Sequence, residues 1–75
     1  MTKENYLELY DFWKNEALNK GFKFKQFQYH INRFLTEEGR QCPESIAIAA
    51  KLAFRALEEE REMELSLQSA VWINQ

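Results

Sequence analysis

The sequence has few of the residues from which the most recognisable functional sites are built. It contains one cysteine, one histidine, one proline and two glycines in 75 residues. A single cysteine excludes an internal disulfide and a zinc site built from several cysteines. Two glycines are too few for a glycine-rich phosphate-binding loop. We therefore expect a single, mostly helical domain over residues 1–75 that binds neither a metal nor a cofactor.

Long hydrophobic runs are also missing. The apolar run at residues 46–50 is far shorter than the roughly 18 residues that a membrane-spanning helix needs. The N-terminus shows no basic segment followed by an apolar one, which is the pattern of a secretory signal peptide. Together with the lone cysteine, these features predict a cytoplasmic protein that does not enter a membrane.

Aromatic residues, by contrast, are abundant and unevenly placed. Nine of the eleven lie between residues 6 and 34. A small domain can bury only a limited share of its surface, so we do not expect it to cover all of these large rings. The surplus predicts a surface for recognition rather than a catalytic centre.

The net charge of −2 conceals a separation of charge along the chain. All charged residues in segment 20–36 are basic, whereas segment 57–75 contains five glutamates and a single arginine. The two segments could attract each other within one chain or between two chains.

The first predicted helix runs from about residue 2 to residue 20. Thr2 suits its N-terminal cap, and Gly21 suits the position after its last turn, where Phe22 can fold back on Ala17. Phe12 falls outside the apolar face of this helix. That face consists of Tyr6, Leu9, Tyr10, Trp13 and Ala17.

The second predicted helix spans residues 23–38 and is ended by Gly39. Residues 22–25 also alternate as a β-strand would, but the helical pattern of apolar residues continues to Leu35 and favours the helix. The apolar arc consists of Phe24, Phe27, Ile31, Phe34 and Leu35.

The third predicted helix begins at Pro43, a residue suited to the first helical position. Two arrangements remain open for its C-terminal part. One continuous helix of about 30 residues would be about 45 Å long and would extend past the other two. A break near residues 61–66 would instead fold the tail back as a fourth helix. The predicted buried face of the third helix consists of Ile46, Ala49, Ala50, Leu52, Ala53, Ala56 and Leu57. The fold class is thus all-α, a three-helix domain with a long or broken C-terminal helix, and a dimeric helical bundle is one outcome.

No combination of residues predicts catalysis. Cys42 precedes a helix N-terminus, where a thiolate is favoured, so a redox role for this thiol is an open alternative. His30 lies on a different predicted helix, at the edge of its apolar arc, and no motif links it to Cys42. Glu60 and Glu64 share one helical face, but the Glu-x-x-His motifs of di-metal bundles are absent. We therefore predict no catalytic residue and no metal ligand.

Apolar residues outside the predicted core are the strongest functional signal, because such residues on a surface are typical of protein interfaces. They predict a small, non-catalytic regulatory protein that binds another protein and forms a homodimer. The alternative is a folded-back tail that buries them in an ordinary four-helix core. The predicted protein-binding residues are Phe12, Phe54, Met63, Leu67, Val71 and Trp72.

A second surface lies on the polar face of the second helix. Tyr29 is placed between Lys25 and Arg33 at intervals of one helical turn, and Lys23 lies just before them. Such a face can bind phosphates or an acidic partner. The sequence pI of about 5.4 disfavours nucleic acid, which is therefore the second choice of partner. We also expect Glu60 and Glu64 to face these basic residues, within one chain or across a dimer.

Overall fold

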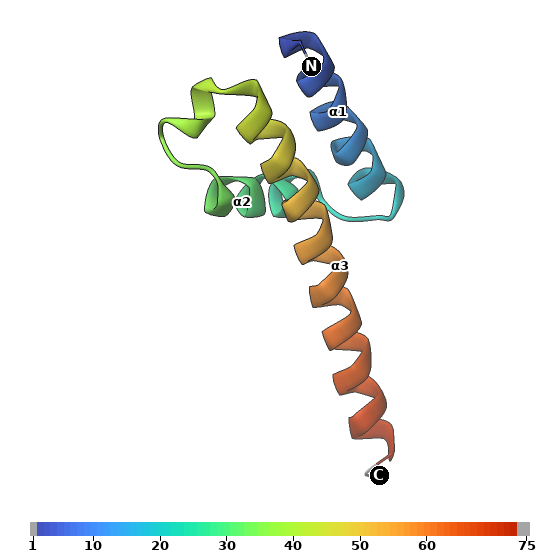
Figure 1. Ribbon diagram of the computed structural model, residues 1–75. Coiled ribbons are helices and arrows are strands. Elements are labelled where there is room, and N and C mark those ends of the chain that lie inside the picture. Colours follow the sequence, from blue (N-terminus) through green and yellow to red (C-terminus); the bar gives the residue numbers. More distant parts are fainter. Residues whose placement is uncertain (1, 74–75) are drawn as a thin grey trace.

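The computed structural model describes the backbone of residues 2–73 and the side chains of residues 2–67. Within this part of the chain there are three α-helices and one short 3-10 helix, and no strand. The elements are α1 (Lys3–Asn19), α2 (Phe24–Phe34), η1 (Gly39–Gln41) and α3 (Pro43–Ile73). α3 packs against both α1 and α2 along its first half and continues beyond them (Figure 1). The all-α fold is confirmed, and the strand interpretation of residues 22–25 is wrong.

α1 begins and ends where its sequence signals predict. The Thr2 hydroxyl accepts a hydrogen bond at 3.4 Å from the backbone N–H three residues later. At the other end Gly21 adopts a φ of 92°, which favours glycine. Its N–H donates to the Leu18 carbonyl, and the Phe22 N–H donates to the Ala17 carbonyl, both at 3.0 Å. This pair of bonds is a Schellman motif, and it turns Phe22 back into the core.

α2 is four residues shorter at its C-terminus than the sequence pattern predicts, because Thr36 starts a turn. Leu35 is already extended, with φ −100° and ψ 131°. The Thr36 hydroxyl accepts a hydrogen bond from the Gly39 N–H at 3.0 Å, and its carbonyl accepts one from the Arg40 N–H at 3.1 Å. Threonine side chains compete with helical hydrogen bonds in this way. Gly39 therefore opens η1 and does not end α2.

The core lies where α1 and α2 meet the alanine-rich first half of α3. Small side chains on α3 let the neighbouring helices approach closely. Phe27 of α2 and Leu57 of α3 are the largest side chains that are completely buried. Tyr10, Trp13 and Leu35 pack around the edge of the core, whose buried members are Ala17, Phe22, Phe27, Ile31, Ala49, Ala50, Ala53, Phe54 and Leu57.

Two predictions about α3 are wrong in opposite directions. Leu52, predicted to be buried, is 38% exposed, whereas Phe54, predicted to bind a partner, is only 6% exposed. The reason is that α1 packs on the side of α3 that carries Phe54. The Trp13 and Phe54 rings lie 5.3 Å apart, and the Lys20 ammonium lies 5.2 Å from the centre of the Phe54 ring. Phe54 is thus a core residue.

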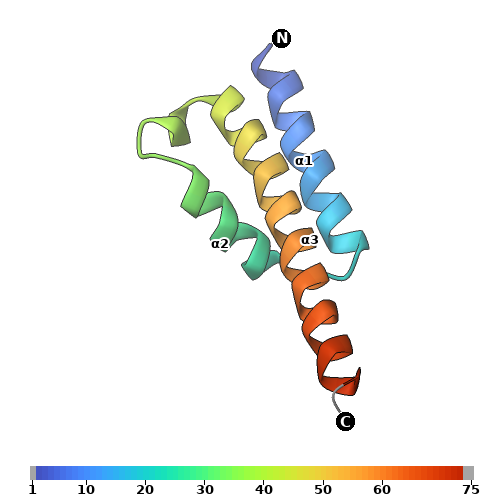
Figure 2. The same cartoon turned by 60° about the horizontal axis from the view of Figure 1, so that its bottom comes forward.

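α3 is one continuous helix of 31 residues, so of the two arrangements left open by the sequence the long helix is confirmed and the folded-back tail is excluded. Its contacts with the end of α1 lie near Arg61, whose guanidinium donates to the Lys20 carbonyl at 2.9 Å. The same guanidinium lies 4.0 Å from the centre of the Phe22 ring, and Lys20 forms an ion pair with Glu58. Residues 62–73, here named the α3 extension, project past α1 and α2 (Figure 2). The molecule is consequently long, with extents of 54, 24 and 19 Å.

No helix in the described part of the chain combines the length and the apolar character that a membrane span needs.

Candidate interaction surface

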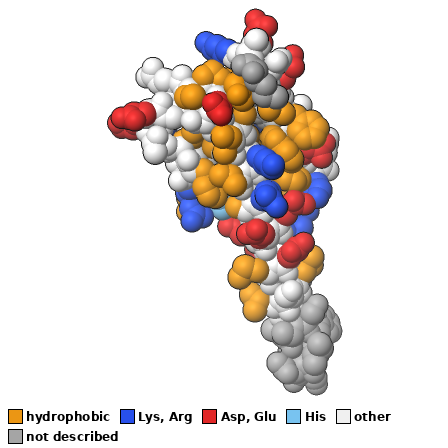
Figure 3. Space-filling view, viewed as in Figure 1, with side chains coloured by type: hydrophobic (Ala, Val, Ile, Leu, Met, Phe, Trp, Pro, Cys, Tyr) orange, Lys and Arg blue, Asp and Glu red, His pale blue; other side chains and the backbone are white. Residues whose placement is uncertain are grey.

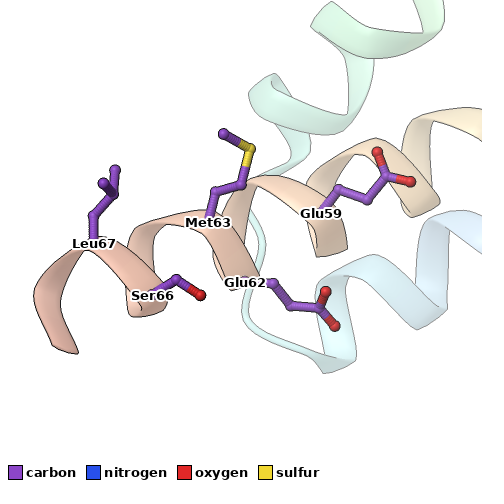
Figure 4. Close-up of a pocket in the computed structure, with 5 residues that line it drawn as sticks. All are labelled: Glu59, Glu62, Met63, Ser66 and Leu67. Atoms are coloured by element: carbon purple, nitrogen blue, oxygen red, sulfur yellow. The ribbon is translucent and has the colours of Figure 1, made fainter. Parts of the chain in front are cut away.

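The α3 extension exposes large apolar side chains. Met63 and Leu67 are each 65% exposed, and Leu65 between them is exposed as well. Met63 and Leu67 project from one side of the helix, where they line a shallow depression together with Glu59, Glu62 and Ser66 (Figure 4). Met63 and Leu67 are therefore as accessible as the sequence pattern predicts. Val71 and Trp72, which were assigned to the same surface, lie outside the described side chains.

The α3 extension lacks the packing that stabilises most protein helices. It continues a helix that is already formed and packed as far as Arg61, so its backbone needs no new nucleus, but Met63, Leu65 and Leu67 remain exposed. Most of the stability of a protein helix comes from burying its apolar face, and within residues 2–67 neither α1 nor α2 covers Met63, Leu65 or Leu67. A protein that packs against this segment would therefore bury apolar surface and stabilise the helix at the same time.

Phe12 is the second predicted contact residue that the structure leaves accessible. It is 50% exposed on α1 and meets the ring of Trp13 edge-on, with centroids 5.0 Å apart. Phe12, Trp13 and Phe54 thus form one row of rings that runs from the surface into the core. Phe12 belongs to the three-helix part, so it does not share a continuous patch with Met63 and Leu67.

The basic residues of α2 and its N-cap are also accessible. Lys23, Lys25, Tyr29 and Arg33 are all exposed. The Arg33 guanidinium lies 5.8 Å from the centre of the Tyr29 ring, within the range of a cation–π contact. Lys25 and Tyr29 also line one shallow pocket, so the structure brings Lys25, Tyr29 and Arg33 together on one surface, as the spacing predicts. Lys23 is exposed at the N-cap of α2.

Glu60 lines a shallow pocket together with Lys25, Tyr29 and His30, so it lies near one of the expected basic residues. Within the described residues, however, neither Glu60 nor Glu64 forms an ion pair with Lys23, Lys25 or Arg33. The Glu60 carboxylate lies 3.1 Å from Nε2 of His30, which is only 2% exposed. Nδ1 of the same ring is buried and has no hydrogen-bond partner among the described residues. His30 was predicted to lie at the edge of the apolar arc, and sequence reasoning missed its role. The sequence does contain a signal for this contact. His30 is one helical turn after the core residue Phe27, and Glu60 lies on the apolar stripe of α3, so both side chains point towards the junction of α2 and α3.

Cys42 is exposed and lies just before α3. Hydrogen bonds from the backbone N–H and the hydroxyl of Ser45 lower the pKa of its thiol. Glu60, and with it His30, lies about 27 Å further along the α3 axis at 1.5 Å per residue. His30 is therefore too far from Cys42 to act as a base for its thiol. Within the described residues, no three His, Cys, Asp or Glu side chains are arranged to hold a metal ion.

No known protein family, no curated protein and no solved structure matches this chain.

Proposed function

We propose that this protein is a small, non-catalytic regulatory protein of the cytoplasm, and that its α3 extension binds another polypeptide. The observation that carries the proposal is the exposure of Met63, Leu65 and Leu67 on the part of α3 that extends beyond α1 and α2. The free, exposed Cys42 is consistent with a reducing compartment.

The chemistry of the α3 extension supports this proposal. Methionine is enriched at protein interfaces, and its flexible side chain adapts to the shape of a partner. Met63 and Leu67 are one helical turn apart, which is the spacing of the apolar anchors that an amphipathic helix places in a groove. Glu59 and Glu62 border the anchors and supply the polar rim that such surfaces have.

The proposal is tested by placing a photo-crosslinking amino acid at position 63 in cells that produce the protein. We expect a discrete adduct from position 63 whose mass exceeds that of one chain. The matched control is the same amino acid at Glu8, which is exposed on α1 away from the extension. Adducts that are equally strong from both positions, or absent from position 63, contradict the proposal.

A nucleic-acid-associated role is the second candidate, and the exposed Tyr29 between Lys25 and Arg33 favours it. A base could stack on the Tyr29 ring while the two cations meet phosphates. Binding of a fluorescent single-stranded oligonucleotide should then weaken steeply with salt. Arg33→Ala should reduce the slope of the salt dependence by about one unit, whereas Lys3→Ala on α1 should leave it unchanged. Absence of binding at low salt would remove this candidate.

A further inference from the structure

One face of α3 is covered by neither α1 nor α2. Its apolar members, Ile48 and Leu52 near the N-terminal end and Met63 and Leu67 near the C-terminal end, are all exposed. These four residues, together with Ala56 and Glu59, lie on one arc of about 100° around the helix. The resulting surface, here named the α3 strip, consists of Ile48, Leu52, Ala56, Glu59, Met63 and Leu67.

The spacing of the α3 strip is the same from both ends. The steps between its members are 4, 4, 3, 4 and 4 residues, with two large apolar side chains at each end and Ala56 and Glu59 in the middle. A second α3 helix that runs in the opposite direction can therefore match both apolar ends, with Ala56 of one copy opposite Glu59 of the other. Leu67 then meets Ile48 of the second copy, and Met63 meets Leu52.

Charges of opposite sign occupy the two halves of the α3 strip. Lys51 and Arg55 lie beside its N-terminal half, whereas Glu59, a member of the strip, and Glu62 beside it lie in its C-terminal half. All four are exposed, and none forms an ion pair with another described side chain. Figure 3 shows this order on the visible face, with hydrophobic, basic, acidic and again hydrophobic side chains along α3.

Antiparallel pairing brings opposite charges together. With the two-fold axis between residues 57 and 58, Lys51 and Arg55 of one copy come beside Glu59 and Glu62 of the other. Parallel pairing would instead place basic against basic and acidic against acidic residues, which is unfavourable. A crossing angle of about 20°, usual in helical bundles, keeps the ends of the two strips within side-chain reach.

We propose that the partner of the α3 extension is a second copy of this chain, bound antiparallel through the α3 strip. This inference rests on the proposed function, because it names the polypeptide that covers Met63 and Leu67. The α3 extension of each copy then lies against Ile48 and Leu52 of the other. Phe12 stays on the surface, because α1 packs on the opposite side of α3.

The register is tested with engineered disulfides in a Cys42→Ser background. Residues 52 and 63 of opposite copies face each other, so the variant L52C/M63C should form a linked dimer in a glutathione redox buffer. The two thiols of the variant L52C alone should stay about 17 Å apart along the helices, too far for a disulfide. We expect at least tenfold more linked dimer from L52C/M63C. Equal linking by L52C alone would indicate parallel pairing and overturn the proposal, as would no linking by L52C/M63C.

The charge pattern is tested with two variants, K51E/R55E and E59K/E62K, by sedimentation velocity. Each variant carries like charges around the whole strip, so each alone should dimerise at least tenfold more weakly than the wild type. An equimolar mixture should form a heterodimer, because the acidic strip then faces the basic one. Circular dichroism of the separate variants checks that both remain helical. Dimerisation of each variant at wild-type strength, or a mixture that stays monomeric, would overturn the proposal.

The failure of this inference can be distinguished from failure of the proposed function. If the wild type is monomeric up to about 1 mM while position 63 crosslinks to a different protein, the second copy is excluded and the binding role stands. If the wild type is monomeric and position 63 gives no specific adduct, both are wrong. A position-63 adduct with the mass of two chains supports both.

Discussion

Phe12 and Phe54 lie at opposite ends of one row of aromatic rings, and they should respond very differently to truncation. Phe54→Ala removes a buried ring that packs on Trp13, so it should lower the free energy of unfolding by about 3–5 kcal/mol. Phe12→Ala removes a half-exposed ring and should cost about 1 kcal/mol or less. Urea titrations at one protein concentration measure both values. Equal losses would mean that Phe12 belongs to the core and is not available to a partner.

Cys42 offers a prediction about pH. Because hydrogen bonds from Ser45 lower its pKa, more of this thiol is ionised at neutral pH than in an unstructured peptide. Alkylation by iodoacetamide should therefore be faster near pH 7 in the folded protein than in the urea-unfolded chain. The rate should also reach its half-maximum at a lower pH. Ser45→Ala removes the hydroxyl donor but keeps the backbone N–H, so it should reverse only part of the effect. Identical pH profiles for the folded and unfolded chains would refute this account.

At the level of single residues, helical periodicity predicts which side chains are apolar and adjacent, but not the direction of the neighbouring helix. The pattern correctly predicts the burial of Ala49, Ala53 and Leu57. It exchanges Leu52 with Phe54, because the buried arc of α3 is rotated toward α1. That rotation depends on the packing of Trp13, which is distant in sequence and is not encoded in the periodicity of α3.

At the level of elements, the ends of α1 and the start of α3 could be read from local signals. Gly21 and Pro43 act through their own backbone, so their effect does not depend on the rest of the fold. The end of α2 could not be read in the same way. Thr36 fits a helix or a turn, and tertiary contacts decide between the two.

The contact between α2 and α3 through His30 and Glu60 also belongs to this scale. Glu60→Ala leaves both nitrogens of a buried imidazole without a protein partner, so it should lower the free energy of unfolding by about 1–3 kcal/mol. Glu64→Ala is the matched control, because Glu64 is exposed one turn later and forms no ion pair with a described residue. We expect a change of about 0.5 kcal/mol or less there. Similar losses for both variants would show that the effect is one of net charge.

At the level of the whole molecule, the sequence predicts a third helix that extends past the other two, and the structure confirms it. The sequence leaves a folded-back tail open because the first two predicted helices are too short to cover the whole length of the third. In the structure Glu60 reaches His30 and α3 continues straight through residues 61–66. The candidate surface could thus be predicted in part. The pattern correctly predicts that Met63 and Leu67 are exposed, whereas the exposure of Leu52 depends on the position of α1.

Self-association through the α3 strip should make thermal stability depend on protein concentration. A dimer that forms only from folded chains raises the melting temperature as the concentration increases, because binding is linked to folding. The wild type should therefore melt at a higher temperature when it is concentrated a hundredfold. The variant Met63→Ser/Leu67→Ser should show no such increase, although its melting temperature at the lowest concentration should stay close to that of the wild type, since both side chains are exposed in a single chain. Calorimetry of both proteins over the same concentration range measures these melting temperatures.

A melting temperature that is independent of concentration for the wild type would mean that the α3 strip does not pair with a second copy. A variant that melts much lower at every concentration would instead place Met63 and Leu67 in the core of the single chain.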